Sequence, residues 1–201
     1  GLEGNFGMVS MGRQYSSQFI ALDNIDPFGT GLAGNSANLF TFPNDIRMNN
    51  SIKYAAPSIG GFTADVVYGL GEVAGNASAK RSVGGSGGYA EGPLLVKLSY
   101  QKDNAAANTA PAVTTVSTGS TKNTQLSGSY DFGIAKLAAA YRKDKADAIV
   151  TSSGPSLKVD ADNLLLGVTV PFGASSFLAS YIRHNDKLSA NQDANQFALG
   201  Y

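Results

Sequence analysis

The sequence predicts an all-β protein, a transmembrane antiparallel β-barrel forming one domain over residues 1–201, and three observations support this fold class. Apolar and polar side chains alternate along many short stretches, as in strands with one oily and one polar face. Short turns and long polar connections alternate along the chain, which is the layout of outer-membrane barrels. Finally, no apolar run approaches the roughly 18 residues that a membrane-crossing helix needs.

The clearest strand pair lies in "RMNNSIKYAAPSIGGFTADVVYG", residues 47–69, where large apolar side chains fall mostly on every second position. Pro57 and the glycine pair at 60–61 mark a tight reversal between the two strands. Residues 8–13 form a shorter stretch, 83–91 are rich in glycine, and the remaining stretches alternate Leu, Val, Ala or aromatic residues with other residues. This alternation predicts about ten strands of membrane-crossing length, at residues 8–13, 46–56, 62–70, 83–91, 94–101, 125–131, 136–142, 164–170, 177–181 and 197–201.

The connections are sorted by length. Short turns are predicted at residues 57–61, 91–93, 131–133 and 171–173, and long connections at 14–45, 71–82, 102–122, 143–161 and 184–194. A soluble sandwich, in which a second layer covers the apolar face, has no reason to sort its loops by end so strictly. In a barrel the turns and the long loops lie at opposite membrane surfaces.

Composition excludes several functional classes. The chain has 15 basic and 15 acidic residues, so it lacks the basic excess of a nucleic-acid-binding protein. It has no cysteine, which excludes disulfides and thiolate metal sites within this chain. We expect no metal site and no cofactor.

Six tyrosines lie near predicted strand ends on the apolar side. Tyrosine is also a good strand former, but position and parity together favour an aromatic girdle at the membrane boundary, where the ring is apolar and the hydroxyl is hydrated. The apolar face is therefore predicted to meet lipid. The girdle consists of Tyr54, Tyr68, Tyr100, Tyr130, Tyr141 and Tyr181.

Three ordered segments resemble the trimeric general porins of Gram-negative β-proteobacteria: "GLEGNFGMVSMGRQYSSQF", "DNIDPFGTGLAG" and "NNSIKYAAPSIGGFTADVVYGLGE". The resemblance implies a 16-stranded, homotrimeric barrel in the bacterial outer membrane with a water-filled diffusion pore. It also implies that residues 14–45 form a constriction loop folded into the barrel. Because about ten strands are predicted, we expect the chain to be an internal portion, lacking roughly four strands at the front and two at the back. A genuine ten-stranded barrel is the alternative.

Function in such a protein would depend on pore width and on the field across the pore, not on catalysis. Parity predicts Arg47 and Lys53 on the pore-facing side, and the resemblance implies a constriction arginine at Arg13. Asp23 and Asp26 would oppose them from the loop. Parity predicts further pore-facing charges at Asp65, Lys97, Asp131, Lys136 and Arg142.

The predicted function is passive diffusion of inorganic ions and small hydrophilic solutes, and the anion-selective members of the resembled family favour a preference for anions. The predicted partners are the lipid bilayer, lipopolysaccharide and further copies in a homotrimer. The alternatives are an adhesin-like barrel and a ten-stranded protease-like barrel. The latter would need His184, the single histidine, to act with Asp186, but no serine lies in a nucleophile motif.

Two glycine-rich motifs do not indicate nucleotide binding. "GTGLAG" at residues 29–34 matches the dinucleotide fingerprint, but Asp26-Pro27-Phe28 precedes it instead of a buried strand. "GGSGG" at residues 84–88 lacks the Lys-Ser/Thr of a P-loop. We expect these glycines to let the loop bend and to leave room for it against the wall.

Overall fold

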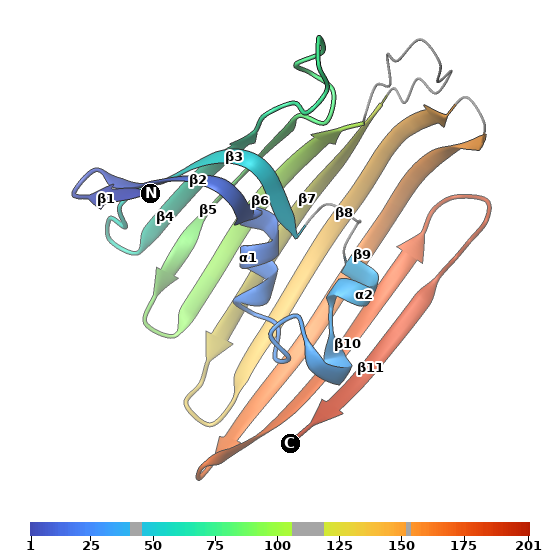
Figure 1. The fold of residues 1–201 in the computed structure, drawn as a ribbon. Coiled ribbons are helices and arrows are strands. Elements are labelled where there is room, and N and C mark those ends of the chain that lie inside the picture. Colours follow the sequence, from blue (N-terminus) through green and yellow to red (C-terminus); the bar gives the residue numbers. More distant parts are fainter. Residues whose placement is uncertain (41–45, 106–118, 152–153) are drawn as a thin grey trace.

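The structure is a computed structural model that describes residues 1–40, 46–105, 119–151 and 154–201, and the side chains of these residues except those of 147–157. Its main feature is one curved, eleven-stranded antiparallel sheet in which each strand pairs with the next along the chain (Figure 1). The strands are β1 (Leu2–Gly4), β2 (Gly7–Tyr15), β3 (Arg47–Ala55), β4 (Phe62–Gly69), β5 (Ser82–Glu91), β6 (Leu94–Asn104), β7 (Ser120–Asp131), β8 (Lys136–Thr151), β9 (Gly154–Phe172), β10 (Ser175–Asp186) and β11 (Ala194–Gly200).

The described helices all lie in the connection between β2 and β3, and they fold against one face of the sheet (Figure 1). They are α1 (Ser17–Asp23), the 3₁₀ helix η1 (Leu32–Gly34) and α2 (Ala37–Phe40). α1 begins where the Ser16 hydroxyl accepts a hydrogen bond from the Phe19 amide at 3.1 Å. We call the described residues 16–40 and 46 the inward segment. The face of the sheet that this segment covers is called the inner face, and the opposite face is called the outer face. Among the described helices, none has the length and apolarity to cross a membrane.

Alternation along each strand gives the two faces different chemistry, as the sequence predicts. On β7, Gln125 and Ser127 face inward and are buried, whereas Leu126 between them faces outward and is 52% exposed. On β8, buried Arg142 follows Tyr141, which is 47% exposed on the outer face. Such a continuous exposed apolar face is unfavourable in water but suits contact with lipid.

A small hydrophobic core lies between the inward segment and the strands beneath it. Leu22 and Ile25 of the segment and Phe40 of α2 cluster with Ala138 and Ala140 of β8, and the cluster also includes Leu165 and Ile182 of β9 and β10. Burial of these side chains stabilises the packing of the segment on the wall, by roughly 1.5–3 kcal/mol for each large apolar side chain.

The predicted sorting of connections is visible in Figure 1, where the short turns lie at one end of the sheet. Gly133 adopts a φ of +81° in one of these turns, and its amide donates to the Asp131 carboxylate at 2.8 Å.

The predicted long connection at 143–161 is wrong. β8 and β9 continue through it as a ladder, in which Lys143 faces Asp162 and Lys145 faces Asp160. Oppositely charged cross-strand pairs stabilise a sheet, as apolar pairs do. The prediction failed because these strands are paired through charged residues and lack the apolar alternation that indicates a strand.

The described residues form eleven strands where about ten are predicted, because residues 2–4 form a short strand paired with β2. Most of the connection predicted at 102–122 lies outside the described residues. Within the described part of the chain, the edge strands β1 and β11 are not paired with each other.

Candidate functional site: a polar wall and the segment folded onto it

The inner face forms a largely polar wall, interrupted where the small hydrophobic core packs beneath the inward segment. It carries carboxylates, amides, hydroxyls and basic groups from neighbouring strands, and α1 lies over β4 to β7 of this wall. Such a surface is suited to line a water-filled space. The wall includes Lys53, Asp65, Ser86, Lys97, Ser99, Gln101, Asn123, Gln125, Ser127, Arg142, Asp144, Asn163 and His184.

One anchor of the inward segment is the carboxylate of Asp65 on β4. It accepts hydrogen bonds from the hydroxyls of Ser17, the first residue of α1, and Ser86 on β5. The Lys53 ammonium on β3 lies 3.6 Å from the same carboxylate, and both side chains are largely buried. The start of α1 is therefore tied to three adjacent strands through one acidic group.

A second anchor is centred on Arg142 of β8, which is only 1% exposed. Its Nε donates to Asp144 Oδ1 at 2.5 Å. When the Gln18 amide is turned so that its oxygen faces the guanidinium, that oxygen accepts from Arg142 Nε at 3.0 Å and from a terminal nitrogen at 3.2 Å. Asn163 donates to Asp144 Oδ2 at 2.6 Å, and its own carbonyl accepts from His184 Nδ1 at 2.6 Å. This chain of contacts links α1 to β8, β9 and β10.

Hydrogen bonds from wall side chains to backbone carbonyls hold the rest of the segment. Ser127 donates to the carbonyl of Ala21 at 3.1 Å, and Lys136 reaches the carbonyl of Asn24 at 3.5 Å. Further along, Gln196 of β11 donates to the carbonyl of Asn35 at 3.2 Å. The segment is thus fixed along much of its described length, which keeps it inside the curve of the sheet.

The two loop aspartates are held by the loop itself. Asp26 is 7% exposed and accepts hydrogen bonds from the amides of Phe28 at 3.0 Å and Thr30 at 3.1 Å. Asp23 accepts the Thr30 hydroxyl at 2.7 Å. Both carboxylates therefore shape the turn at 26–30, and within the described residues neither forms an ion pair with Arg13, Arg47 or Lys53.

The alternation that predicts Arg47 on the same face as Lys53 is interrupted between the two residues by a bulge in β3, and Arg47 lies at the start of β3, beside the inward segment. Asn50 has a φ of +45°, and the pairs Ser51–Gly12 and Met48–Gln14 leave one extra residue in β3. Met48, which is buried, therefore takes the inner position. Arg47 instead donates to the Tyr15 hydroxyl at 2.6 Å, and its guanidinium lies 4.6 Å from the centre of that ring.

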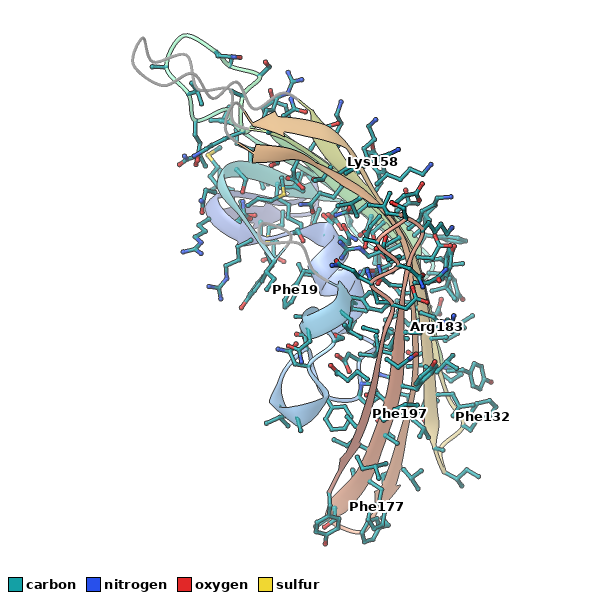
Figure 2. All side chains as sticks on the ribbon, turned by 90° about the vertical axis from the view of Figure 1, so that its right-hand side faces the viewer. Phe19, Phe132, Lys158, Phe177, Arg183 and Phe197 are labelled. Carbon is teal, nitrogen blue, oxygen red and sulfur yellow. The ribbon has the colours of Figure 1, made fainter. Side chains whose placement is uncertain are left out.

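Tyr15 connects this arginine to the inward segment, because its ring stacks on Phe19 of α1 with 5.0 Å between centroids. Figure 2 shows Phe19 on the side of α1 away from the long strands β8 to β10. Arg13 lies in β2 just after Gly12, whose φ is +108°, and its side chain is exposed. The two arginines therefore remain accessible at the start of the segment, while Lys53 lies beneath it.

The further charges predicted on the inner face are placed there by the strand registers. Lys97 pairs with Ser127, whose hydroxyl contacts the segment, and Lys136 itself contacts it. Asp131 pairs with Lys136 at the short-turn end, where it caps the turn at Gly133. Asp65 and Arg142 are the two anchors described above.

All six predicted girdle tyrosines lie on the outer face. Five are between 40% and 47% exposed: Tyr54, Tyr68, Tyr100, Tyr130 and Tyr141. Tyr181 is half-buried and donates to Asn195 at 2.9 Å. Additional aromatics extend the girdle at the short-turn end, where Phe172, Phe177 and Tyr201 form one cluster.

Sequence reasoning missed the partners that complete the anchors, Gln18, Asp144 and Asn163. They carry no motif, and only the strand registers bring them together. His184 belongs to this network, whereas Asp186 accepts the amides of Leu188 at 2.9 Å and Gln192 at 3.0 Å. In the described structure, His184 and Asp186 therefore have different hydrogen-bond partners, and no hydrogen bond joins them as a protease-like site would need.

Comparison with known proteins agrees with this architecture. A family profile described as Gram-negative porin matches residues 1–201, the whole chain. The chain belongs to the Gram-negative porin family. This confirms the resemblance drawn from the three sequence segments and the predicted barrel fold class, and it localises the chain to the bacterial outer membrane.

Two curated relatives of the porin are outer-membrane porin proteins. The chain is 31% identical to outer membrane porin protein 32 of Delftia acidovorans over 211 residues, covering 100% of this chain and 56% of that protein. It is 27% identical to an outer membrane porin protein of Bordetella pertussis over 230 residues, covering 98% of this chain and 59% of that protein. The chain therefore spans less than two thirds of the length of these relatives.

Solved structures show the same fold. The anion-selective porin from Comamonas acidovorans superposes with a TM-score of 0.75 at 25% identity, over 98% of this chain and 59% of that one. The trimer form of OmpT from Vibrio cholerae superposes with a TM-score of 0.65 at 17% identity, over 97% and 60%.

Proposed function

We propose that this porin forms part of a general diffusion channel of the outer membrane, which passes inorganic ions and small hydrophilic solutes passively. The observation that carries the proposal is the inward segment, held against the polar inner face by the Asp65 and Arg142 anchors. A polypeptide segment fixed inside a curved polar wall narrows the enclosed aqueous space without closing off its polar lining. In such a channel pore width and pore charge select the solute, and no catalysis is involved.

The complete channel in this proposal is a 16-stranded barrel that assembles as a homotrimer. Two considerations support the proposal that additional strands close the barrel. The edges of β1 and β11 are unpaired with each other in the described residues, and an open sheet edge in lipid leaves backbone polar groups unsatisfied. The relatives are also longer than this chain, and one solved neighbour is described in a trimer form.

The proposed constriction, residues 14–45 with the wall around them, uses charges on two sides. Arg13 and Arg47 remain exposed beside the start of the inward segment, and Lys53 lies in the wall. Asp23 and Asp26 are fixed within the turn of that segment. Separated fixed charges of opposite sign produce a transverse field in a narrow aqueous space. We infer a preference for anions, supported by the exposed arginines and by the anion-selective neighbour.

Single-channel recording of the protein purified from its source membrane, in a planar bilayer with a salt gradient, tests the proposal. Stable conductance steps that close in groups of three would support a trimeric diffusion channel, and the reversal potential reports the ion preference. The Arg47→Ala, Lys53→Ala double variant should shift selectivity toward cations. Folded protein that gives no conductance would overturn the channel function, and an unchanged reversal potential in the double variant would overturn the assignment of these two residues.

A further inference from the structure

The Arg142 anchor ends in a side chain that is less buried than the others. Arg142, Asp144 and Asn163 are at most 2% exposed, whereas His184 is only half-buried. Ile182, two residues earlier on β10, packs in the small core, and alternate residues of a strand share a face. His184 therefore lies on the inner face, one inner position beyond the core in the direction of the long connections, and borders the space beside the inward segment.

Hydrogen bonds determine which nitrogen of this ring gains or loses a proton. An ionised carboxylate only accepts hydrogen bonds, so the Asn163 amide presents its nitrogen to Asp144, at 2.6 Å. The Asn163 carbonyl then faces His184 Nδ1, also at 2.6 Å. Because a carbonyl only accepts as well, Nδ1 carries a proton. The proton that the ring exchanges is therefore the one on Nε2.

This arrangement lets the ring change its charge without changing its place. The Nδ1 hydrogen bond to Asn163 is made by the neutral ring and by the protonated ring alike. Elsewhere in the anchor, the charges of Arg142 and Asp144 balance each other, and Asn163 is neutral. A proton on Nε2 of His184 thus adds one net positive charge to the inner face at a fixed position.

Acidic groups predominate around His184 among the described side chains of the inner face. Asp186 lies two residues further along β10, and Asp193 in the connection that follows accepts a hydrogen bond from the Asp186 amide at 2.9 Å. Asp144 on β8, with its partner Arg142, lies beyond Asn163. Neighbouring carboxylates favour the charged form of an imidazole.

The elements packed against this part of β10 add no other inner charge within the described residues. Neither β11 nor α2 contains a titratable side chain. On β9, Lys158, Asp160 and Asp162 alternate with inward residues such as Asn163, so they lie on the outer face with Arg183 of β10. The outer pairs are Asp160 with Lys145 and Asp162 with Lys187.

We propose that His184 is a specificity-determining residue of the channel, whose protonation in mildly acidic water raises the preference for anions. This inference rests on the proposed function, since it takes the inner face to line the aqueous pore. Histidine is the side chain whose charge ordinarily changes between pH 5 and 8, and this chain contains one. The added positive charge attracts anions at low pH. As the pH rises, Nε2 loses its proton and the preference declines.

The test measures the reversal potential in a salt gradient from pH 5.5 to pH 8 for the parent, His184→Gln and His184→Lys. In the parent, the anion-to-cation permeability ratio should rise about two- to threefold toward pH 5.5, the size expected for one unit charge in a hydrated pore. His184→Gln should stay near the parent's value at pH 8, and His184→Lys near its value at pH 5.5. Other groups titrate in all three proteins, so the differences between them isolate His184.

Arg183→Gln is the control, because Arg183 is the preceding residue but is exposed on the outer face. It should keep the pH dependence of the parent. The same pH dependence in the parent and in His184→Gln would overturn the proposal, and so would its loss in Arg183→Gln. A merely structural role of His184 would shift both of its variants in the same direction at every pH, which would also overturn the proposal.

A second measurement does not require conductance. Protein labelled with ¹⁵N in its histidine rings is titrated in detergent micelles by NMR, and the spectrum of His184→Gln identifies the His184 signals. Between pH 8 and pH 5.5 the Nε2 signal should move from that of a bare nitrogen to that of a protonated one, while Nδ1 stays protonated. A ring that keeps one charge state throughout this range, or that titrates at Nδ1, would overturn the inference. Absence of conductance in the parent would instead overturn the proposed function, so the two failures are distinguishable.

Discussion

Arg142 shows how one side chain can hold the inward segment in place. It is almost completely enclosed, and its charge is balanced by Asp144 while its guanidinium also faces Gln18 of α1. A buried ion pair is costly to assemble but is strongly destabilising when one member is removed, because the other charge stays buried without compensation. Asn163 donates to the same Asp144 carboxylate and in turn accepts from His184, which extends the network to β9 and β10.

Replacement of this residue by an apolar one of similar length should therefore weaken the whole network. We expect Arg142→Met to lower the free energy of unfolding by about 3–5 kcal/mol, measured by urea unfolding in lipid vesicles. The loosened α1 should also increase the noise of the open-channel current. Lys143→Met is the control, because Lys143 is the next residue but is exposed on the outer face. Equal stability of the two variants would contradict the anchoring role of Arg142.

Lys53 and Asp65 form an ion pair at the start of α1, and we expect the ion preference of the proposed channel to depend on it. Lys53→Gln leaves the Asp65 carboxylate with its two serine donors and without the ammonium 3.6 Å away. The anion-to-cation permeability ratio should fall by about two- to fivefold, which corresponds to less than about 1 kcal/mol. The reversal potential in a salt gradient measures this ratio. Asp65→Asn should shift it in the opposite direction, and a shift of the same sign in both variants would show that the pair does not act through its charge.

At the scale of elements, the inward segment and the wall fit each other through small residues on the strands. The inward positions of β5, beneath α1, are Gly84, Ser86 and Gly88. This agrees with the expectation that the glycine-rich stretch leaves room for the segment. On β9, a Cβ added to Gly167 would lie 2.6 Å from Pro27 of the segment, which shows how closely the two approach.

A single methyl group at Gly167 should therefore displace the turn at Pro27. Gly167→Ala is expected to reduce stability by about 1–3 kcal/mol, as overpacking usually does, and to change the unit conductance because the segment shifts into the pore. Gly87→Ala is the matched control, since its added Cβ would meet only the Thr63 carbonyl oxygen at 4.0 Å. Unchanged conductance in Gly167→Ala, with the control also unchanged, would mean that the segment does not narrow the path.

At the scale of the whole molecule, the sheet separates a polar inner face from an apolar outer one. The outer face is bounded by aromatics at the short turns and by tyrosines and basic groups toward the long connections. A soluble sheet would bury this apolar face against a second layer. In the described structure the helices instead cover the polar face, which is the arrangement of a membrane barrel.

The depth of the outer face can be probed on one strand. Leu126 and Thr124 are both exposed on the outer face of β7, but Leu126 lies within the apolar region and Thr124 lies beside Tyr100 at its border. Leu126→Arg should cost about 2–4 kcal/mol of folding free energy in vesicles, and Thr124→Arg only about 0–1. Reversible unfolding in lipid measures both. Equal costs would contradict the placement of the hydrocarbon boundary at the tyrosines.

Much of this architecture can be predicted from local sequence patterns. Alternation of side chains along each strand is a local property, and it identified the strands, their outward face and the tyrosine girdle. Turn residues such as Gly133 and the glycine pair at 60–61 located the reversals. These features depend only on near neighbours in the chain, so they can be predicted from single stretches.

The site was less predictable because it depends on long-range register. Alternation by itself predicts Arg47 and Lys53 on the same face of the sheet, whereas the bulge at Asn50 interrupts the alternation between them. Charged residues at 143–161 resembled a loop, but pairing across β8 and β9 made them a ladder. Asp23 and Asp26 were identified as acidic residues of the segment, whereas their binding to Thr30 emerged only from the folded turn.

The sequence by itself determined that this porin is built of membrane-length strands with one face for lipid and one for water, because side-chain period is fixed by the strand geometry of each stretch. Only the tertiary structure decided which polar groups hold the inward segment. Ser17 and Asp65, like Gln18 and Arg142, are far apart in sequence, and the register of several strand pairs is needed to bring them within hydrogen-bond distance. One extra residue in a strand reverses the face of every residue beyond it, so such contacts cannot be obtained from local patterns.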